Sequence, residues 1–145
     1  MKIIVDAMGG DNAPQAPVMG AIQANKAYGV DITLVGRGEE ILKVLKDNGI
    51  QDLPAGVEIA HASEVVEICD NPATAFREKK DSSLTVGLNL LKNGEGDAFV
   101  SAGSTGALLG AATLLIKRIK GIRRAALAPM AGVTDVAFRQ FFIST

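Results

Sequence analysis

The segment SAGSTGA, from Ser101 to Ala107, combines two glycines with three hydroxyl side chains. It lies between an apolar run that predicts a strand over Ala98–Ser101 and an apolar-faced stretch that predicts a helix over Thr105–Lys117. Glycines let backbone amides approach a ligand closely, and the first amides of a helix point outwards at the positive end of its dipole. The segment therefore predicts an anion site with phosphate as the natural ligand. The alternative is that Ser104 or Thr105 only caps the helix.

A second polar segment, DAMGGDNAP, follows the first predicted strand. The side chains of Asp6, Asp11 and Asn12 could hold a metal ion, orient a lysine or accept hydrogen bonds from a substrate. Equally, Asp11 or Asn12 could cap the next helix, with Gly9 and Gly10 as simple turn residues. Spacing alone leaves both interpretations open.

The stretch NPATAFREKKDSS gathers Arg77, Lys79 and Lys80 immediately before Ser82 and Ser83. Cations beside the free amides of a helix could bind phosphate. A solvated charged surface with a capping serine is the more common outcome for such a run.

Two further residues have chemical potential of their own. His61 follows a predicted strand and could act as a general base, although an ordinary hydrogen-bonded histidine is more common. Cys69 lacks a motif for nucleophilic catalysis, so we expect a structural role. No cysteine and histidine array has zinc spacing, and no metal site is predicted.

The elements that position these residues alternate between short apolar strands and helices of about ten to fifteen residues. This order predicts an α/β fold, in which a parallel sheet carries helices on both faces. Such sheets bind ligands beyond the carboxyl ends of their strands, which here points to the loops Asp6–Asn12, Gly36–Gly38, His61–Glu64 and Ser101–Thr105. The predicted strands are Lys2–Asp6, Ile32–Val35, Val57–Ala60 and Ala98–Ser101, and the predicted helices begin at Pro14 and cover Glu39–Asn48, Ser83–Asn93 and Thr105–Lys117.

Composition limits the number of domains, the kinds of partner and the cellular compartment that we expect for the chain. A length of 145 residues with 48% hydrophobic content suits one domain with a genuine core. Fifteen Lys and Arg against sixteen Asp and Glu give a net charge of −1, which favours neither nucleic acid nor an anionic membrane as a partner. The single cysteine and the absence of a signal-peptide pattern after Met1 predict a cytoplasmic protein. No apolar stretch approaches the roughly 20 residues of a membrane-spanning helix.

Three motifs together resemble the phosphate acyltransferases called PlsX. They are VDAMGGDNAP from Val5, HASEVVEICDNPATAFREKKDSS from His61 and DAFVSAGSTGALL from Asp97. The resemblance covers Met1 to about Ala128, which would form the N-terminal part of such an enzyme. It implies a Rossmann-like fold similar to phosphotransacetylases and isopropylmalate-dehydrogenase-type enzymes. It also implies transfer of a fatty acyl group from acyl carrier protein to inorganic phosphate, giving acyl-phosphate for phospholipid synthesis.

The resemblance further implies a set of site residues. No metal or organic cofactor is implied, whereas a homodimer and a peripheral membrane contact are implied for the full-length family. Asp6, Asp11 and Asn12 would organise the floor of the pocket, and His61 would handle a proton or polarise the carbonyl. The catalytic candidates are Lys80, His61 and Asp11, and the phosphate- or substrate-binding candidates are Asp6, Gly9, Gly10, Asn12, Ser82, Ser101, Gly103, Ser104, Thr105 and Gly106.

The end of the chain resembles a different family. We predict a PlsX-like domain over residues 1–126 and a foreign tail over 127–145, because LAPMAGVTDVAFRQFF resembles the start of the flavin-dependent tRNA-dihydrouridine synthases. So short a piece cannot form a barrel of about 250 residues, so we expect no reductase activity. The hypothesis is a junction near Leu127–Met130 made by gene fusion, a frame error or mis-assembly. The alternative functions are then a merely phosphate-binding half-domain or a truncated, inactive chain. An unpaired sheet edge and an uncovered apolar helix face would favour aggregation.

Overall fold

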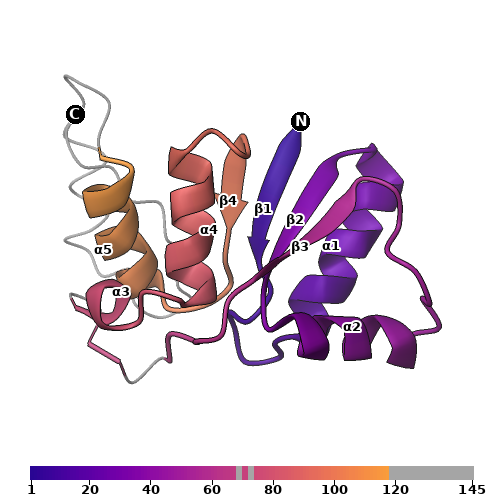
Figure 1. Ribbon diagram of the computed structural model, residues 1–145, viewed down its shortest axis with the longest axis horizontal. Helices are drawn as coiled ribbons and strands as arrows, with labels where there is room; N and C mark the ends of the chain where they lie inside the picture. The colour runs from indigo at the N-terminus through magenta and orange to yellow at the C-terminus, as the bar shows by residue number, and fades with distance from the viewer. Residues whose placement is uncertain (68–69, 72–73, 118–145) are drawn as a thin grey trace, which may run out of the picture.

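The computed structural model describes residues 1–67, 70–71 and 74–117. The predicted tail and Cys69 lie outside the described residues. Four parallel strands form an open sheet in the order β3-β2-β1-β4 (Figure 1). The predicted α/β class and parallel sheet are confirmed. The strands are β1 (Lys2–Asp6), β2 (Asp31–Gly36), β3 (Val57–His61) and β4 (Ala98–Val100).

The described helices match the predicted positions closely, with one addition. They are α1 (Gln15–Tyr28), α2 (Gly38–Asp47), α3 (Ala75–Glu78), α4 (Ser83–Lys92) and α5 (Thr105–Leu115). The prediction that α1 begins at Pro14 is wrong by one residue, because Pro14 is the N-cap and its carbonyl accepts from the Val18 amide at 3.1 Å. The four-residue helix α3 was not predicted, since one turn is too short to show an apolar period.

Helices cover both faces of the sheet, as predicted. In Figure 1, α1 and α2 lie on one side of the sheet and α4 and α5 on the other. The α1 and α2 face buries the larger core, in which Val18, Ile22 and Leu45 pack against Ile32 and Leu34. This arrangement leaves the loops after the strands as the places where polar groups can gather.

On the opposite face, α4 packs directly on the sheet and α5 packs beside α4. Ile4 and Val35 meet the apolar face of α4 there. Gly87, in the middle of α4, lies against the ring of Phe99 on β4. Because a glycine faces the strand, the helix can approach the sheet closely.

Apolar side chains remain exposed on β4 and α5. Val100 is 53% exposed, Leu109 44% and Leu114 50%. Within the described residues β4 pairs only with β1, so its other edge is open. Among the described residues, the open β4 edge and the exposed α5 side chains match the unpaired edge and uncovered helix face expected from the sequence. No described helix is both long enough and apolar enough to cross a membrane.

Candidate functional site

Two of the predicted loops, those after β1 and β4, meet at the point where the strand order changes direction. From β1 the chain proceeds outwards through β2 to β3, and it then crosses back to add β4 on the other side of β1. The loops after β1 and β4 therefore diverge at neighbouring carboxyl ends. This switch point is where open α/β sheets bind ligands.

Asp6 and Ser101 join these two loops. Asp6, the last residue of β1, is only 3% exposed. Its Oδ2 accepts a hydrogen bond from the Ser101 hydroxyl at 2.7 Å, and its Oδ1 accepts from the Met8 amide at 3.1 Å. The Ser101 hydroxyl oxygen in turn accepts from the Gly103 amide at 3.1 Å. Two loops that are 95 residues apart in sequence are thus joined through one buried carboxylate.

Glycine permits the backbones of the two loops to touch. A Cβ on Gly9 would lie 2.7 Å from Asp6 Oδ2, 2.8 Å from Ser101 Oγ and 2.9 Å from the Gly103 nitrogen. Gly10 has a φ of 103° and lies against Ala102. Gly9, Gly10 and Gly103 therefore belong to one close contact between the two loops.

The beginning of α5 presents free donors beside this contact. Ser104 is the N-cap, and its Oγ accepts from the Ala107 amide at 3.4 Å. Within the described residues, the amides of Thr105 and Gly106 and the Thr105 hydroxyl donate to no protein group. The capping alternative is thus confirmed for Ser104 and wrong for Thr105. Capping by Ser104 still leaves donors that can bind an anion.

Ser82 and Lys80 lie at the beginning of α4. Ser82 is fully buried and caps the helix, because its Oγ accepts from the Thr85 amide at 3.3 Å. Its hydroxyl also lies 2.8 Å from the Lys79 carbonyl oxygen, to which it can donate. Lys80 is exposed and forms no ion pair among the described residues. The capping interpretation of Ser82 is confirmed, and Lys80 has its ammonium available.

Lys79 differs from its neighbour. Its Nζ contacts Asp70 Oδ2 at 2.5 Å and the Val65 carbonyl at 2.8 Å, and its side chain is 29% exposed. The Lys79 ammonium lowers the pKa of Asp70 below its ordinary value. Lys79 therefore holds the segment before α3 in place through Val65 and Asp70. Of the two adjacent lysines, Lys79 has a structural role and Lys80 is available to bind an anion.

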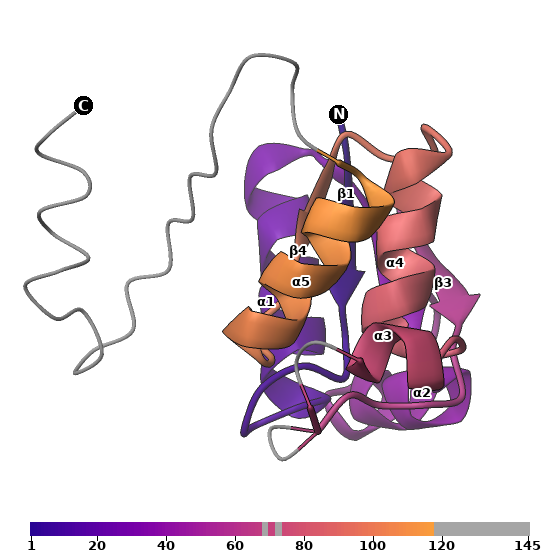
Figure 2. The same cartoon turned by 90° about the vertical axis from the view of Figure 1, so that its left-hand side faces the viewer.

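Packing brings the beginnings of α4 and α5 together. Phe76 of α3 shares one buried cluster with Leu84 of α4 and Ala107 of α5. Figure 2 shows α3 at the lower end of α4 and beside α5. The charged stretch that ends in Lys80 therefore lies on the same side of the sheet as the α5 donors.

Asp11 and Asn12 are exposed in the loop after β1. Neither side chain caps α1, which has no side-chain cap, so that alternative is wrong. Only the Asn12 carbonyl contributes, accepting from the Ala16 amide at 2.9 Å. Both side chains remain at the rim of the switch point.

His61 lies elsewhere on the carboxyl edge. It ends β3, which β2 separates from β1, and its Nδ1 accepts from the Gly38 amide at 3.5 Å. Nearby, Asp81 accepts from the Ser63 hydroxyl at 2.5 Å and from the Ser63 amide at 3.0 Å. These bonds lower the pKa of Asp81. The Ser63–Asp81 pair was not predicted, since no spacing in the sequence links the two residues.

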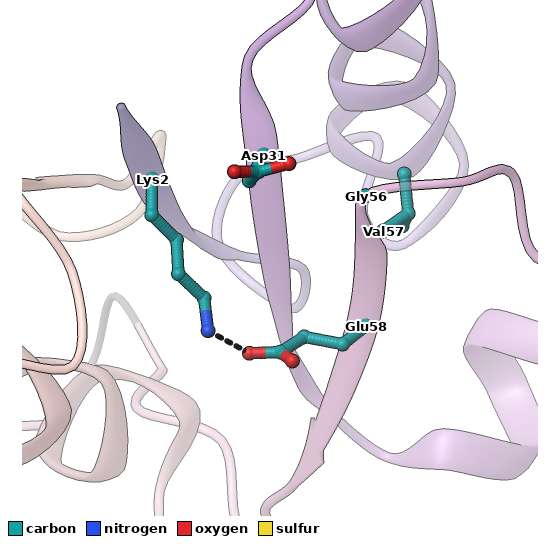
Figure 3. Close-up of a pocket in the computed structure, with 5 residues that line it drawn as sticks. All are labelled: Lys2, Asp31, Gly56, Val57 and Glu58. Carbon is teal, nitrogen blue, oxygen red and sulfur yellow. Dashed lines mark ion pairs between the residues drawn. The ribbon is translucent and has the colours of Figure 1, made fainter.

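A separate hollow of about 300 Å³ lies at the opposite, amino end of the strands (Figure 3). Lys2 on β1 reaches past β2 to form an ion pair with Glu58 on β3. Thr33 donates a second bond to Glu58 at 2.8 Å. These partners lower the pKa of Glu58, and Glu58 raises that of Lys2. Because Lys2 and Glu58 neutralise each other's charge, the hollow is not the expected anion site.

The part of the chain that the structure describes contains no group of three or more His, Cys, Asp or Glu side chains arranged to hold a metal ion. The free donors at the switch point are the amides of Thr105 and Gly106 and the Thr105 hydroxyl, and the stretch that ends in Lys80 lies on the same side of the sheet. This donor set suits an oxyanion such as phosphate.

Comparison with known proteins supports the motifs. Residues 1–136 match the family described as "Fatty acid synthesis protein". The phosphate acyltransferase of Geotalea daltonii is 48% identical over 128 residues, covering 88% of this chain and 36% of that protein. That of Thermoanaerobacter pseudethanolicus is 48% identical over 131 residues, covering 90% and 38%, and that of Desulfitobacterium hafniense (strain DSM 10664 / DCB-2) is 49% identical over 127 residues, covering 88% and 37%. The chain thus spans little more than a third of the length of these relatives. These matches, together with the three motifs and the parallel sheet, show that the chain belongs to the fatty acid synthesis protein family, whose members compared above are named phosphate acyltransferase.

Proposed function

We propose that this chain carries the phosphate-binding part of an enzyme that transfers a fatty acyl group from acyl carrier protein to inorganic phosphate. The product is acyl-phosphate for phospholipid synthesis, and the free carrier is released. The observation that carries the proposal is the set of free donors at the first turn of α5, beside the β1 and β4 loops. The relatives are named phosphate acyltransferases, and this name supports phosphate as the acceptor and acyl transfer as the reaction class.

Phosphate is the nucleophile in this reaction. One of its oxygens attacks the carbonyl carbon of the thioester, a C–O bond forms, and the C–S bond then breaks to release the thiolate of the carrier. The protein must hold the dianion in line with the carbonyl and neutralise the developing oxyanion. The free amides of Thr105 and Gly106 and the Thr105 hydroxyl can bind the phosphate oxygens.

The other predicted residues take different places. Lys80 supplies the positive charge, while Ser82 contributes through the cap that fixes the beginning of α4. Asp11 and Asn12 lie exposed in the loop after β1, where they can orient the acyl carrier substrate. His61 contacts no phosphate in this scheme, because it ends β3 at the outer edge of the sheet. The whole protein is proposed to be a cytoplasmic homodimer with a peripheral membrane contact.

The test is acyl-phosphate formation from palmitoyl-acyl-carrier-protein and phosphate. This chain is compared with the same chain extended by the remaining part of a relative such as the Geotalea daltonii protein. Activity in the extended protein supports the proposal. If both proteins are active, all essential groups lie within this chain. An extended protein that forms no acyl-phosphate contradicts the proposal, provided that the intact relative is active in the same assay.

A second candidate function is phosphate binding without acyl transfer. It is favoured by the free donors at the first turn of α5, which are present in a chain that covers about a third of its relatives' length. Titration of this chain with inorganic phosphate distinguishes the two functions: saturable binding with no acyl-phosphate in either protein favours the second. Lys80→Ala should weaken phosphate binding. The matched control is Lys43→Ala, on the exposed side of α2, which should leave binding unchanged.

A further inference from the structure

We infer that Asp6 and Ser101 are positioning residues: together they hold the loop after β4 against the loop after β1 and so fix the first turn of α5. The inference rests on the proposed function, because it concerns the same phosphate site. It assigns these two residues a role distinct from that of phosphate ligands.

The hydrogen bonds of Ser101 carry the first step. Its hydroxyl donates to Asp6 Oδ2 at 2.7 Å and accepts from the Gly103 amide at 3.1 Å. A serine hydroxyl can donate only one hydrogen bond, and here it donates that bond to the Asp6 carboxylate. The Ser101 hydroxyl therefore cannot donate to a phosphate oxygen while this bond stands, and the Gly103 amide is likewise occupied.

The charge of Asp6 carries the second step. A buried carboxylate pointing at a phosphate dianion would repel it, so a ligand role is unfavourable. Asp6 is instead satisfied within the protein by Ser101 and by the Met8 amide. Its position at the end of β1, in the centre of the sheet order, makes it a rigid anchor for the neighbouring loop.

The third step is the short path from this anchor to the donors. Gly103 is followed by the N-cap Ser104 and then by the free amides of Thr105 and Gly106. Releasing the Gly103 amide from Ser101 lets the N-cap move, and the donors move with it. The absence of a side chain on Gly9 keeps the contact closed, since a Cβ there would meet Asp6, Ser101 and Gly103.

The experiment uses this chain and inorganic phosphate, with dissociation constants measured by titration calorimetry. Ser101→Ala removes the bridging hydroxyl, and Gly9→Ala inserts a methyl group into the contact. We expect each change to weaken phosphate binding about tenfold, the factor that corresponds to roughly one displaced hydrogen bond. Ser101→Thr retains the hydroxyl and should bind within about threefold of the unaltered chain.

Gly20→Ala is the matched control, because a Cβ there meets nothing within 4 Å. It should leave binding unchanged. Cooperative thermal unfolding of every variant excludes general loss of the fold as the cause. A second measurement is hydrogen exchange, in which Ser101→Ala should accelerate the Gly103, Ala107 and Leu108 amides but not those in α1 and α2.

The outcomes separate the inference from the proposed function. Unaltered binding in both Ser101→Ala and Gly9→Ala overturns the inference and leaves phosphate binding intact, and Ser101→Thr that fails as badly as Ser101→Ala also overturns it. If the unaltered chain binds no phosphate, the proposed site in this chain fails. Hydrogen exchange then decides the positioning role alone, and unchanged exchange at Gly103 in Ser101→Ala overturns it.

Discussion

Gly87→Ala is expected to destabilise the protein although alanine is the better helix former. Gly87 lies in the interior of α4, and a Cβ there would be 2.2 Å from Cε2 and 3.0 Å from Cδ2 of Phe99. Contacts this short do not occur, so the ring or the helix must move. The substitution therefore tests whether α4 is held at the close distance that the structure shows.

Two opposing effects set the magnitude. Replacing glycine by alanine in a helix stabilises it by about 1 kcal/mol. Inserting a methyl group into a packed interface costs about 1–3 kcal/mol, and so short a contact belongs at the upper end of that range. The net expectation is a loss of about 2 kcal/mol in the free energy of unfolding.

Urea denaturation followed by circular dichroism measures this loss. Gly20→Ala in α1 is the control, because its Cβ meets nothing within 4 Å, and it should gain about 0.5–1 kcal/mol. Phe99→Leu should recover part of the loss when combined with Gly87→Ala, so the two changes should be non-additive. A Gly87→Ala protein at least as stable as the unaltered chain would refute the reasoning, as would strictly additive effects of the two changes.

Three further predictions concern single groups. Lys80→Ala should raise the phosphate dissociation constant while leaving the urea midpoint unchanged, whereas Lys79→Ala should lower the midpoint; the reverse pattern would contradict the assignment. Ser82→Ala should cost about 2 kcal/mol in urea denaturation, because it removes the cap and leaves a buried threonine amide unpaired; a loss below about 0.5 kcal/mol would count against this. The pKa values of Asp70 and Asp81 are lowered by bonds to Lys79 and Ser63, respectively, so both carboxylates stabilise the fold above their ordinary pKa of 3.8. That contribution should disappear as the pH falls through their lower folded values, and urea midpoints that stay constant from pH 5 to about pH 2 would exclude it.

Much of the fold could be predicted because its signals are local. Glycine stops, short β-branched runs and apolar helical periods located every described strand and four of the five described helices. The parallel sheet then followed from the alternation of strand and helix. The helix α3 escaped because it has four residues, and the start of α1 was misplaced because proline is compatible with both positions.

The candidate site was predictable only as a set of loops. Asp6 and Ser101 could each be assigned to the carboxyl end of a strand, but their hydrogen bond depends on β1 and β4 being neighbours in the sheet, which the sequence did not predict. The division of labour between Lys79 and Lys80 was not predictable, because it depends on the distant Asp70 and Val65. The outlying position of His61 likewise follows from strand order, which no local pattern fixes.

The strand order also determines when the switch point can form during synthesis. β1, β2 and β3 are consecutive neighbours, whereas β4 begins at Ala98, 37 residues after β3 ends at His61. At about 5–20 residues per second, translation takes roughly 2–7 s to span that gap. During this interval one edge of β1 lacks its partner and Asp6 lacks the Ser101 hydroxyl. One of the two inner strands of the described sheet is therefore completed late, and the nascent chain must keep its open edge soluble until β4 has been synthesised.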